Sequence, residues 1–244
     1  MNILVVLPAR NEELIIRDNV LRLYEYMQGA FPNDDWKIVV SDNNSSDRTA
    51  EIVKELAEKH ARIEYLLVTV VGKGAAVKNA WEKYSSDVYM FMDSDLATDI
   101  HGIPMLVEPL RLETSDIACG SRFLRESAVE RSLIRRVTSF GYRLVVKLLL
   151  SIKVRDLPCG FKAINEKAKK ALLSKIESDG WFFDSELIIL GEKLGLRVQE
   201  IPVRWREPIE TGRKSKVKII SLSIEYVKEV VKIRKRLQKM KAEL

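Results

Sequence analysis

The residues Val88-Tyr89-Met90-Phe91-Met92-Asp93-Ser94-Asp95 decide how the first half of this chain folds. The apolar run 88–92 is typical of a strand that is buried on both faces of a sheet. Asp93 and Asp95 follow it directly, at the sheet edge where open α/β folds bind ligands. Hard cations such as Mg²⁺ and Mn²⁺ prefer carboxylate oxygens and often share them with a diphosphate. An ordinary polar loop that caps a helix before Ile100 is the alternative.

Further Val- and Ile-rich runs precede this strand, and helix-like stretches separate them. The expected strands are residues 3–7, 37–41, 63–69 and 88–92, and the expected helices are residues 11–27, 47–60 and 73–84. This alternation predicts an α/β fold with a mostly parallel sheet and helices on both faces. In the second half we expect strands at 117–119 and 198–203, a loop ending in a strand at 156–164, and helices at 132–150, 184–193 and 217–241.

The composition indicates one large folded domain, or one domain with an appendage. The chain has 244 residues, of which 46% are hydrophobic and 31% are charged. No apolar run reaches the ~18 residues that a membrane-spanning helix needs. The N-terminus lacks the pattern of a signal peptide. Cys119 and Cys159 fit free thiols in a reducing cytosol, so we expect a cytoplasmic protein.

Polar residues follow the other expected strands at the same edge. Asp42 can accept a hydrogen bond from a nucleobase N–H, and Asp47 can cap the helix that follows it. The segment Pro8–Glu13 predicts a tight turn and an acidic first helical turn, which capping alone would also explain. Residues 72–74, Gly-Lys-Gly, precede a helix, where backbone amides and the lysine are expected to meet a phosphate.

Several other sites are excluded because their motifs are missing. Residues 72–77 have neither the glycine spacing of a P-loop nor the third glycine of a dinucleotide fingerprint. The sequence has no nucleophile elbow for a hydrolase triad, and no H-E-x-x-H or C-x-x-C for zinc. His60 and His101 are the only histidines, and we interpret both as incidental.

The order of these motifs resembles glycosyltransferase family 2, the inverting enzymes of the GT-A fold. The segments that carry the resemblance are PARNEE at 8–13, DNNSSDRT at 42–49, GKG at 72–74, DSDLAT at 93–98, GSR at 120–122, DLPCGFK at 156–162, WFFDSEL at 181–187 and IPVRWRE at 201–207. The later segments are similar to dolichyl-phosphate β-glucosyltransferases. The related dolichyl-phosphate mannose synthases usually carry Gln where Ala97 stands. The resemblance covers about residues 1–220 and implies a GT-A, Rossmann-like mixed sheet.

The resemblance also implies roles for individual residues. It assigns nucleotide binding to Pro8, Ala9, Arg10, Glu12, Asp42, Lys73, Asp93, Ser94 and Lys216. It assigns a divalent cation, Mg²⁺ or Mn²⁺, to Asp93 and Asp95, with Asp95 as the main ligand. It places Asp95, Arg122, Asp184 and Glu186 at the reaction centre, with Arg122 facing the acceptor phosphate.

Two segments of the chain are strongly basic. Residues 122–155 carry a net charge of +7 and residues 211–244 carry +8, which leaves −9 for the rest of a chain whose total is +6. This pattern suggests an anionic partner, although two solvated helix faces would also explain it. A nucleic-acid partner is disfavoured because Tyr226 is the only aromatic residue interleaved with the basic tail.

Both basic segments are amphipathic when they are projected onto a helix. The apolar arc of the first helix contains Leu133, Ile134, Val137, Phe140, Leu144, Val145 and Leu148. Such helices suit a membrane interface, and core packing with a basic solvent face is the alternative. We expect a catalytic domain at 1–212 that includes an amphipathic interface helix at 126–152, and a basic amphipathic helix at 213–244. Arg131 and Arg135 share a helix face and are expected to join Arg122 at the lipid phosphate.

The predicted function is that of a metal-dependent inverting glycosyltransferase. It would transfer glucose from UDP-glucose to a polyprenyl phosphate such as dolichyl phosphate. It would bind peripherally to the cytoplasmic face of a membrane, with a homodimer assisting. Donors carrying mannose or N-acetylglucosamine stay open. A hydroxyl acceptor also stays open, and it would need Asp184 or Glu186 as a base. A sugar nucleotidyltransferase is disfavoured because Pro8–Glu13 contains no glycine.

Overall fold

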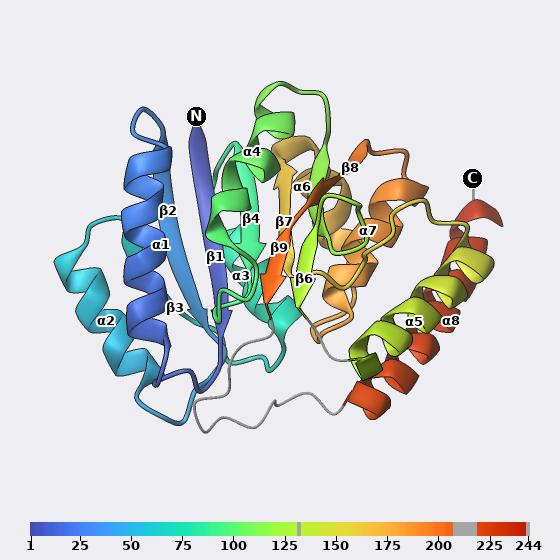
Figure 1. Ribbon diagram of the computed structural model, residues 1–244, viewed down its shortest axis with the longest axis horizontal. Helices are drawn as coiled ribbons and strands as arrows, with labels where there is room; N and C mark the ends of the chain where they lie inside the picture. Colours follow the sequence, from blue (N-terminus) through green and yellow to red (C-terminus); the bar gives the residue numbers. More distant parts are fainter. Residues whose placement is uncertain (131–132, 207–218, 243–244) are drawn as a thin grey trace.

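The structure is a computed structural model that describes residues 1–130, 133–206 and 219–242. A seven-stranded sheet of order β3-β2-β1-β4-β7-β5-β8 runs through its centre, and helices cover both faces (Figure 1). The strands are β1 Asn2–Ala9, β2 Asp35–Asp42, β3 Ile63–Leu67, β4 Val88–Met92, β5 Ile117–Ser121, β7 Phe161–Asn165 and β8 Val198–Pro202. Strand β7 is antiparallel to both of its neighbours, and the other pairs are parallel. The sheet is therefore mixed and mostly parallel, as predicted.

The helices alternate with the strands through the first half of the chain. Their bounds are α1 Ile16–Ala30, α2 Thr49–Lys59, α3 Lys73–Lys83, α4 Ile103–Arg111, α5 Leu133–Leu150, α6 Glu166–Leu172, α7 Phe183–Lys193 and α8 Ile219–Ala242, with short 3₁₀ turns at Ile100–Gly102 and Leu173–Lys175. The prediction placed the start of α1 too early. Asn11 has a φ of 56°, a left-handed conformation that a helix does not accommodate.

Two elements of the second half differ from the prediction. Residues 128–130 form strand β6, which pairs with β9 (Arg204–Arg206) in a separate two-stranded sheet. The helix expected over 126–152 therefore begins only at Leu133. Thr98 forms an isolated bridge with Trp205 of β9. This small sheet consequently lies beside the loop that follows β4.

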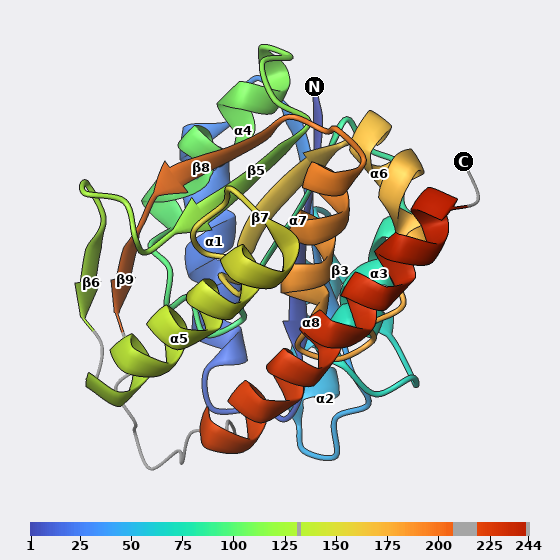
Figure 2. The same cartoon turned by 90° about the vertical axis from the view of Figure 1, so that its right-hand side faces the viewer.

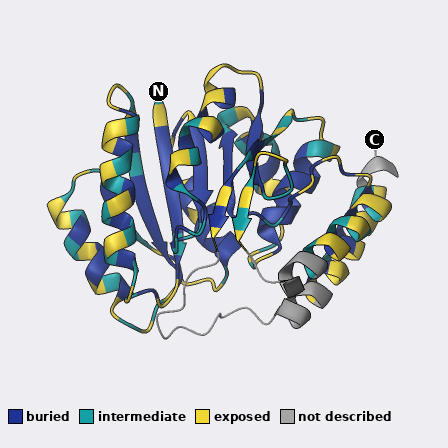
Figure 3. Cartoon of the chain, viewed as in Figure 1, coloured by how far each residue is buried: buried dark blue, intermediate teal, exposed yellow. Residues whose placement is uncertain are grey.

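The sheet separates two hydrophobic cores, and β4 contributes to both. Val88, Met90 and Met92 pack into the core shared with α1, α2 and α4, whereas Tyr89 and Phe91 pack into the core shared with α3, α5, α6, α7 and α8. This explains why the run 88–92 is apolar at every position. Figure 3 shows the sheet as a continuous buried layer between partly exposed helices.

Helices α5 and α8 lie side by side on the second face (Figure 2). The rings of Tyr142 and Tyr226 meet edge to face with centroids 5.2 Å apart. Val146, Val230 and Ile233 are fully or almost fully buried. The described part of the C-terminal helix is therefore integrated into the core.

A different face of these helices remains exposed. Phe140, Leu144 and Leu148 on α5 are 61%, 47% and 72% exposed, and Val227 and Val231 on α8 are also exposed. We call these five residues the apolar ridge. The three α5 members belong to the apolar arc found by helical projection. Within the described residues, no helix combines the length and the apolar content that crossing a bilayer requires.

Candidate functional site

The carboxyl end of β4 presents the acidic triplet at the sheet edge, as expected. The Asp93 amide donates to the Gly160 carbonyl over 3.2 Å, and the Asp95 carboxylate accepts from the Ala97 amide at 3.0 Å. Leu96 adopts a left-handed φ of 50°, which turns the chain sharply at this point. The Ser94 carbonyl accepts from the Asn19 side chain at 2.9 Å. Hydrogen bonds to two other segments, and one bond within the loop itself, therefore fix the triplet.

Lys73, at the start of α3, joins two carboxylates from distant parts of the chain. Its ammonium lies 2.7 Å from Asp93 and 2.7 Å from Asp184. Burial alone would lower the pKa of Lys73, but the two carboxylates outweigh burial and hold that pKa above its ordinary value. Burial raises the pKa of Asp184, and the Lys73 ammonium opposes that rise. Lys73 therefore acts as a fixed internal cation beside Asp93, one of the two predicted metal ligands.

The amino end of α3 is occupied by another part of the protein. The Gly74 amide donates to the Gly180 carbonyl at 3.3 Å, and the Ala75 amide donates to the Asp179 carbonyl at 3.0 Å. A Cβ at Gly72 or Gly74 would overlap the carbonyls of this loop. The prediction that these amides meet a phosphate is therefore wrong for this structure. The glycines instead allow the loop before α7 to approach α3.

Asp42 is buried at the end of β2. Its carboxylate accepts from the Tyr65 hydroxyl at 2.9 Å and from the Ser45 amide at 3.1 Å. Burial and the neighbouring Asp42 carboxylate raise the pKa of Tyr65 to about 12. The next residue, Asn43, accepts from the Gly72 amide at 2.6 Å and donates to the Val70 carbonyl at 2.6 Å. Sequence reasoning missed Asn43, which ties β2 to the loop before α3.

The loops after β1 and β2 are joined to each other. The Glu12 amide donates to the Thr49 hydroxyl at 2.7 Å, and the Glu13 amide donates to Asp47 at 3.1 Å. Asp47 also accepts from the Thr49 amide at 3.0 Å, so it supports the start of α2, but it lies one residue before the N-cap position, which Arg48 occupies. Pro8 and Ala9 close β1 opposite the end of β2, whereas Arg10 is exposed. The structure thus brings the predicted nucleotide-binding residues of both loops together.

Arg122 follows β5 and is held by a carboxylate that sequence reasoning did not single out. Its Nε and Nη2 atoms each donate to Asp156 at 2.8 Å, and its backbone amide donates to the same carboxylate at 2.8 Å. Burial opposes ionisation, but the Arg122 guanidinium holds the pKa of Asp156 below its ordinary value. The guanidinium also lies 5.6 Å from the centre of the Trp205 ring.

Lys162 is a second buried lysine that the sequence reasoning missed. It is fully buried, and its ammonium donates to the Leu157 carbonyl at 2.8 Å and to the Cys159 carbonyl. A charged residue within the apolar strand 161–165 was the available signal. The loop between Asp156 and Lys162 also touches Asp93, because a Cβ at Gly160 would overlap the Asp93 carboxylate.

Asp184 and Glu186 have different partners, although both lie in the first turn of α7. The Glu186 carboxylate accepts from the Ser178 amide at 2.8 Å and from Arg236 of α8 at 2.6 Å. Glu186 therefore holds the loop before α7, whereas the Lys73 ammonium pairs with Asp93 and Asp184. Its predicted place at the reaction centre is not supported by this geometry.

Three predicted residues cannot be placed. Arg131 and Lys216 lie outside the described residues. The backbone of Arg135 belongs to α5, but its side chain is outside the described part of the structure.

The chemistry at Asp93 and Asp95 fits a divalent cation that is shared with a substrate. Within the described residues, no three His, Cys, Asp or Glu side chains gather to hold a metal by themselves. Asp93 and Asp95 offer hard carboxylate oxygens, and the Asp93 side chain is 38% exposed. A cation bound here would complete its coordination with diphosphate oxygens and water, as Mg²⁺ usually does.

Comparisons with known proteins agree with this arrangement. The family described as Glycosyl transferase family 2 matches residues 4–173. Glycosyltransferase AglD of Haloferax volcanii is 36% identical over 208 residues, which cover 85% of this chain and 33% of that protein. A dolichyl-phosphate beta-glucosyltransferase of Trichomonas vaginalis is 31% identical over 238 residues, which cover 93% of this chain and 72% of that protein. The chain thus spans about a third of the Haloferax protein and most of the Trichomonas protein.

The fold has a solved counterpart. Glucosyl-3-phosphoglycerate synthase from Mycobacterium tuberculosis, crystallised with Mn²⁺, uridine diphosphate and phosphoglyceric acid, has a TM-score of 0.70 and 22% identity. The match covers 96% of this chain and 78% of that chain. The fold is therefore that of the GT-A glycosyltransferases. The family match, the identity to curated relatives and the mixed sheet together show that this chain belongs to glycosyltransferase family 2.

Proposed function

We propose that this glycosyltransferase moves glucose from UDP-glucose to a polyprenyl phosphate such as dolichyl phosphate, with inversion at the sugar. The main support for this proposal is that Asp93 contacts both Lys73 and the loop that contains Gly160. Asp93 binds Lys73 on one side and packs against Gly160 on the other, within the loop whose Asp156 holds Arg122. Donor-side carboxylates and an acceptor-side cation thus share one sheet edge. The dolichyl-phosphate beta-glucosyltransferase named above supports the choice of lipid and sugar.

The donor would lie against the loops after β1, β2 and β4. Asp42 would accept from the base, while Asp93 and Asp95 would hold Mg²⁺ or Mn²⁺ beside the diphosphate. The cation supplies positive charge that stabilises the leaving nucleotide. The Mn²⁺ and uridine diphosphate in the related synthase structure support this arrangement. Lys73 would keep Asp93 and Asp184 in place beneath the sugar.

Arg122 would bind the phosphate of the acceptor. A guanidinium carries five N–H donors, so it can bind Asp156 and a phosphate at the same time. The acceptor is already an anion, and the displacement therefore needs no strong general base. Asp184 is paired with Lys73 at 2.7 Å, which supports a positioning role over proton abstraction.

The apolar ridge supports peripheral binding to a membrane, and we place this binding at the cytoplasmic face as part of the proposal. Its α5 members alternate with Arg143 and Lys147, and its α8 members alternate with Lys228 and Lys232. Apolar side chains flanked by basic ones suit an interface with anionic lipid. This placement would keep the prenyl chain in the bilayer and its phosphate at the site. A homodimer that assists membrane binding remains part of this proposal.

A donor screen tests the proposed reaction. The purified chain is incubated with Mn²⁺, a short-chain prenyl phosphate and UDP-glucose, GDP-mannose or UDP-N-acetylglucosamine in turn, and the lipid products are identified by mass spectrometry. We expect a glucosylated prenyl phosphate of β configuration. Transfer of mannose or N-acetylglucosamine alone would overturn the sugar assignment. Product only with a hydroxyl acceptor would overturn the lipid assignment.

A further inference from the structure

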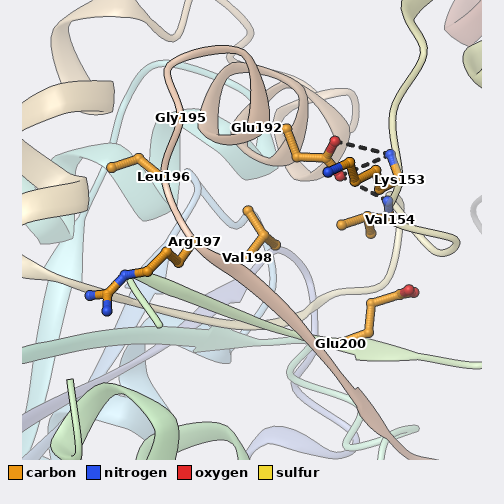
Figure 4. Close-up of a pocket in the computed structure, with 8 residues that line it drawn as sticks. All are labelled: Lys153, Val154, Glu192, Gly195, Leu196, Arg197, Val198 and Glu200. Carbon is orange, nitrogen blue, oxygen red and sulfur yellow. Dashed lines mark hydrogen bonds between the residues drawn. The ribbon is translucent and has the colours of Figure 1, made fainter. Parts of the chain in front are cut away.

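The loop that connects α5 to β7 is held by carboxylates along four consecutive backbone amides. Glu192 of α7 accepts from the amides of Lys153 at 2.9 Å and Val154 at 2.8 Å. Glu200 of β8 accepts from the amides of Arg155 at 2.9 Å and Asp156 at 3.3 Å. Figure 4 shows the bonds between Glu192 and this loop, and it shows Glu200 on a different element. These carboxylates thus replace the backbone partners that a strand would have provided.

The second pair of amides includes that of Asp156, the residue whose side chain binds Arg122. Asp156 is fully buried, and its side chain makes the three 2.8 Å bonds to Arg122 described above. The backbone of Asp156 is thus fixed by Glu200, while its side chain fixes the guanidinium. Strands β5 and β8 pair in register, with Cys119 opposite Glu200 and Ser121 opposite Pro202. Glu200, where these contacts begin, therefore lies on β8, and Arg122, where they end, directly follows the paired strand β5.

We propose that Glu200 is a positioning residue for Arg122, acting through the backbone at 155–156 and the carboxylate of Asp156. This inference rests on the proposed role of Arg122 at the acceptor phosphate. Two parallel hydrogen bonds from a guanidinium to a phosphate require a fixed plane, and a small displacement weakens both. Without Glu200, the amides of Arg155 and Asp156 lose their acceptor and the loop relaxes. Asp156 then no longer holds the guanidinium in one orientation.

Glu192 provides a matched control. It binds the same loop with the same kind of bond, but at the amides of residues 153–154, whereas Arg122 is held by Asp156. Removal of either carboxylate leaves two amides without an acceptor. Only removal of Glu200 acts on the residue that holds Arg122. A general loss of loop order and a specific loss of positioning are therefore distinguishable.

The experiment measures binding of farnesyl phosphate and of the sugar nucleotide separately, by calorimetry on the full chain. For Glu200→Ala we expect the Kd of farnesyl phosphate to rise about tenfold, with the Kd of the sugar nucleotide changed less than about twofold. Glu200→Gln retains an acceptor oxygen and is expected to restore binding to within about threefold of wild type. Glu192→Ala is expected to stay within about threefold as well, because residues 155–156 keep their partner. If Glu200→Ala does not fold, Glu200→Asp withdraws the carboxylate by one methylene and should weaken farnesyl phosphate binding in the same direction.

Unchanged farnesyl phosphate affinity in folded Glu200→Ala or Glu200→Asp would overturn the inference. Equal weakening by Glu192→Ala would also overturn it, as would failure of Glu200→Gln to restore binding. Arg122→Lys is measured in parallel. If Arg122→Lys binds farnesyl phosphate like wild type, the proposed acceptor role fails. If it binds weakly while Glu200→Ala does not, only the positioning role of Glu200 fails.

Discussion

The ammonium of Lys73 lies 2.7 Å from the carboxylate of Asp184, although 111 residues separate them in the sequence. Both side chains are almost completely buried. This ion pair joins the first turn of α3 to the first turn of α7, and the same ammonium lies 2.7 Å from Asp93. It therefore links the loop after β4 to the second half of the chain.

Removal of the lysine should destabilise the fold strongly. Lys73→Met leaves two carboxylates without their cation, one of them buried, and we expect a loss of about 3–5 kcal/mol in the free energy of unfolding. Urea unfolding followed by tryptophan fluorescence measures it. The control is Lys78→Met on the same helix, whose partner Asp179 is half exposed, and there we expect about 1 kcal/mol or less. Equal losses in the two variants would contradict a buried, structural ion pair.

Asp95→Asn should abolish transfer without unfolding the protein. Asp95 lies in a partly exposed loop beyond β4. Asparagine has the same shape as aspartate but lacks the negative charge that binds a divalent cation. Loss of Mn²⁺ binding, measured by electron paramagnetic resonance, should accompany the loss of activity. Asp99→Asn, in the adjoining turn, serves as the control and should bind Mn²⁺ normally. Full wild-type activity in EDTA would argue against a metal at Asp93 and Asp95.

Arg122→Lys should affect the acceptor more than the donor. Lysine keeps a positive charge near Asp156 but cannot form two parallel hydrogen bonds to a phosphate. We expect the KM for a soluble prenyl phosphate to rise, or kcat to fall, by about tenfold, which corresponds to about 1.4 kcal/mol. The KM for the sugar nucleotide should barely change. Arg125→Lys, at an exposed position nearby, should behave like wild type. A similar change in KM or kcat for this variant would contradict a specific role of Arg122 in binding the acceptor phosphate.

Leu148→Glu should weaken membrane binding while leaving the fold intact. Leu148 is 72% exposed on the apolar ridge, so a charge there disturbs lipid contact and not the core. Co-sedimentation with anionic liposomes, at low and high salt, measures the effect. Leu112→Glu is the control, because Leu112 is 63% exposed just after α4 and outside the ridge. Deletion of α8 would be a poor test, since it removes Val230 and Ile233 from the core. If both variants co-sediment with liposomes to the same extent, the apolar ridge does not contribute to membrane binding.

Acid should destabilise the protein partly through Asp116. This buried carboxylate accepts from Arg197 and Lys167, and the Arg197 guanidinium holds the pKa of Asp116 well below its ordinary value. Because that pKa is lower in the folded state, the stabilising contribution is present above the unfolded value of about 4 and is lost as the pH falls. Urea midpoints should therefore fall from about pH 5 to about pH 2 in wild type and fall less steeply in Asp116→Asn. Parallel pH profiles for the two proteins would contradict this role.

The alternation of strands and helices was predictable from local sequence, and so was the sheet edge at which the candidate site lies. The run 88–92 is apolar at every position because β4 is covered on both faces, and such a pattern is local and readable. Asp93 and Asp95 follow it directly, so their place at the carboxyl end of a strand needed no tertiary information. The loops after β1 and β2 were predicted for the same reason. Strands β6 and β9 were missed because each has three residues and exists only through pairing with the other.

Which charged side chains meet depends on the tertiary structure. Three ion pairs join residues that are far apart in the sequence. They are Lys73–Asp184, 111 residues apart, Arg122–Asp156, 34 residues apart, and Glu186–Arg236, 50 residues apart. Local periodicity also left the burial of α5 undecided, because this helix carries apolar residues on more than one face. Packing against α8 buries Tyr142 and Val146 and leaves Phe140 and Leu148 exposed. Propensity and alternation act over a few neighbouring residues, whereas ion pairing and burial depend on which distant segments the topology brings together.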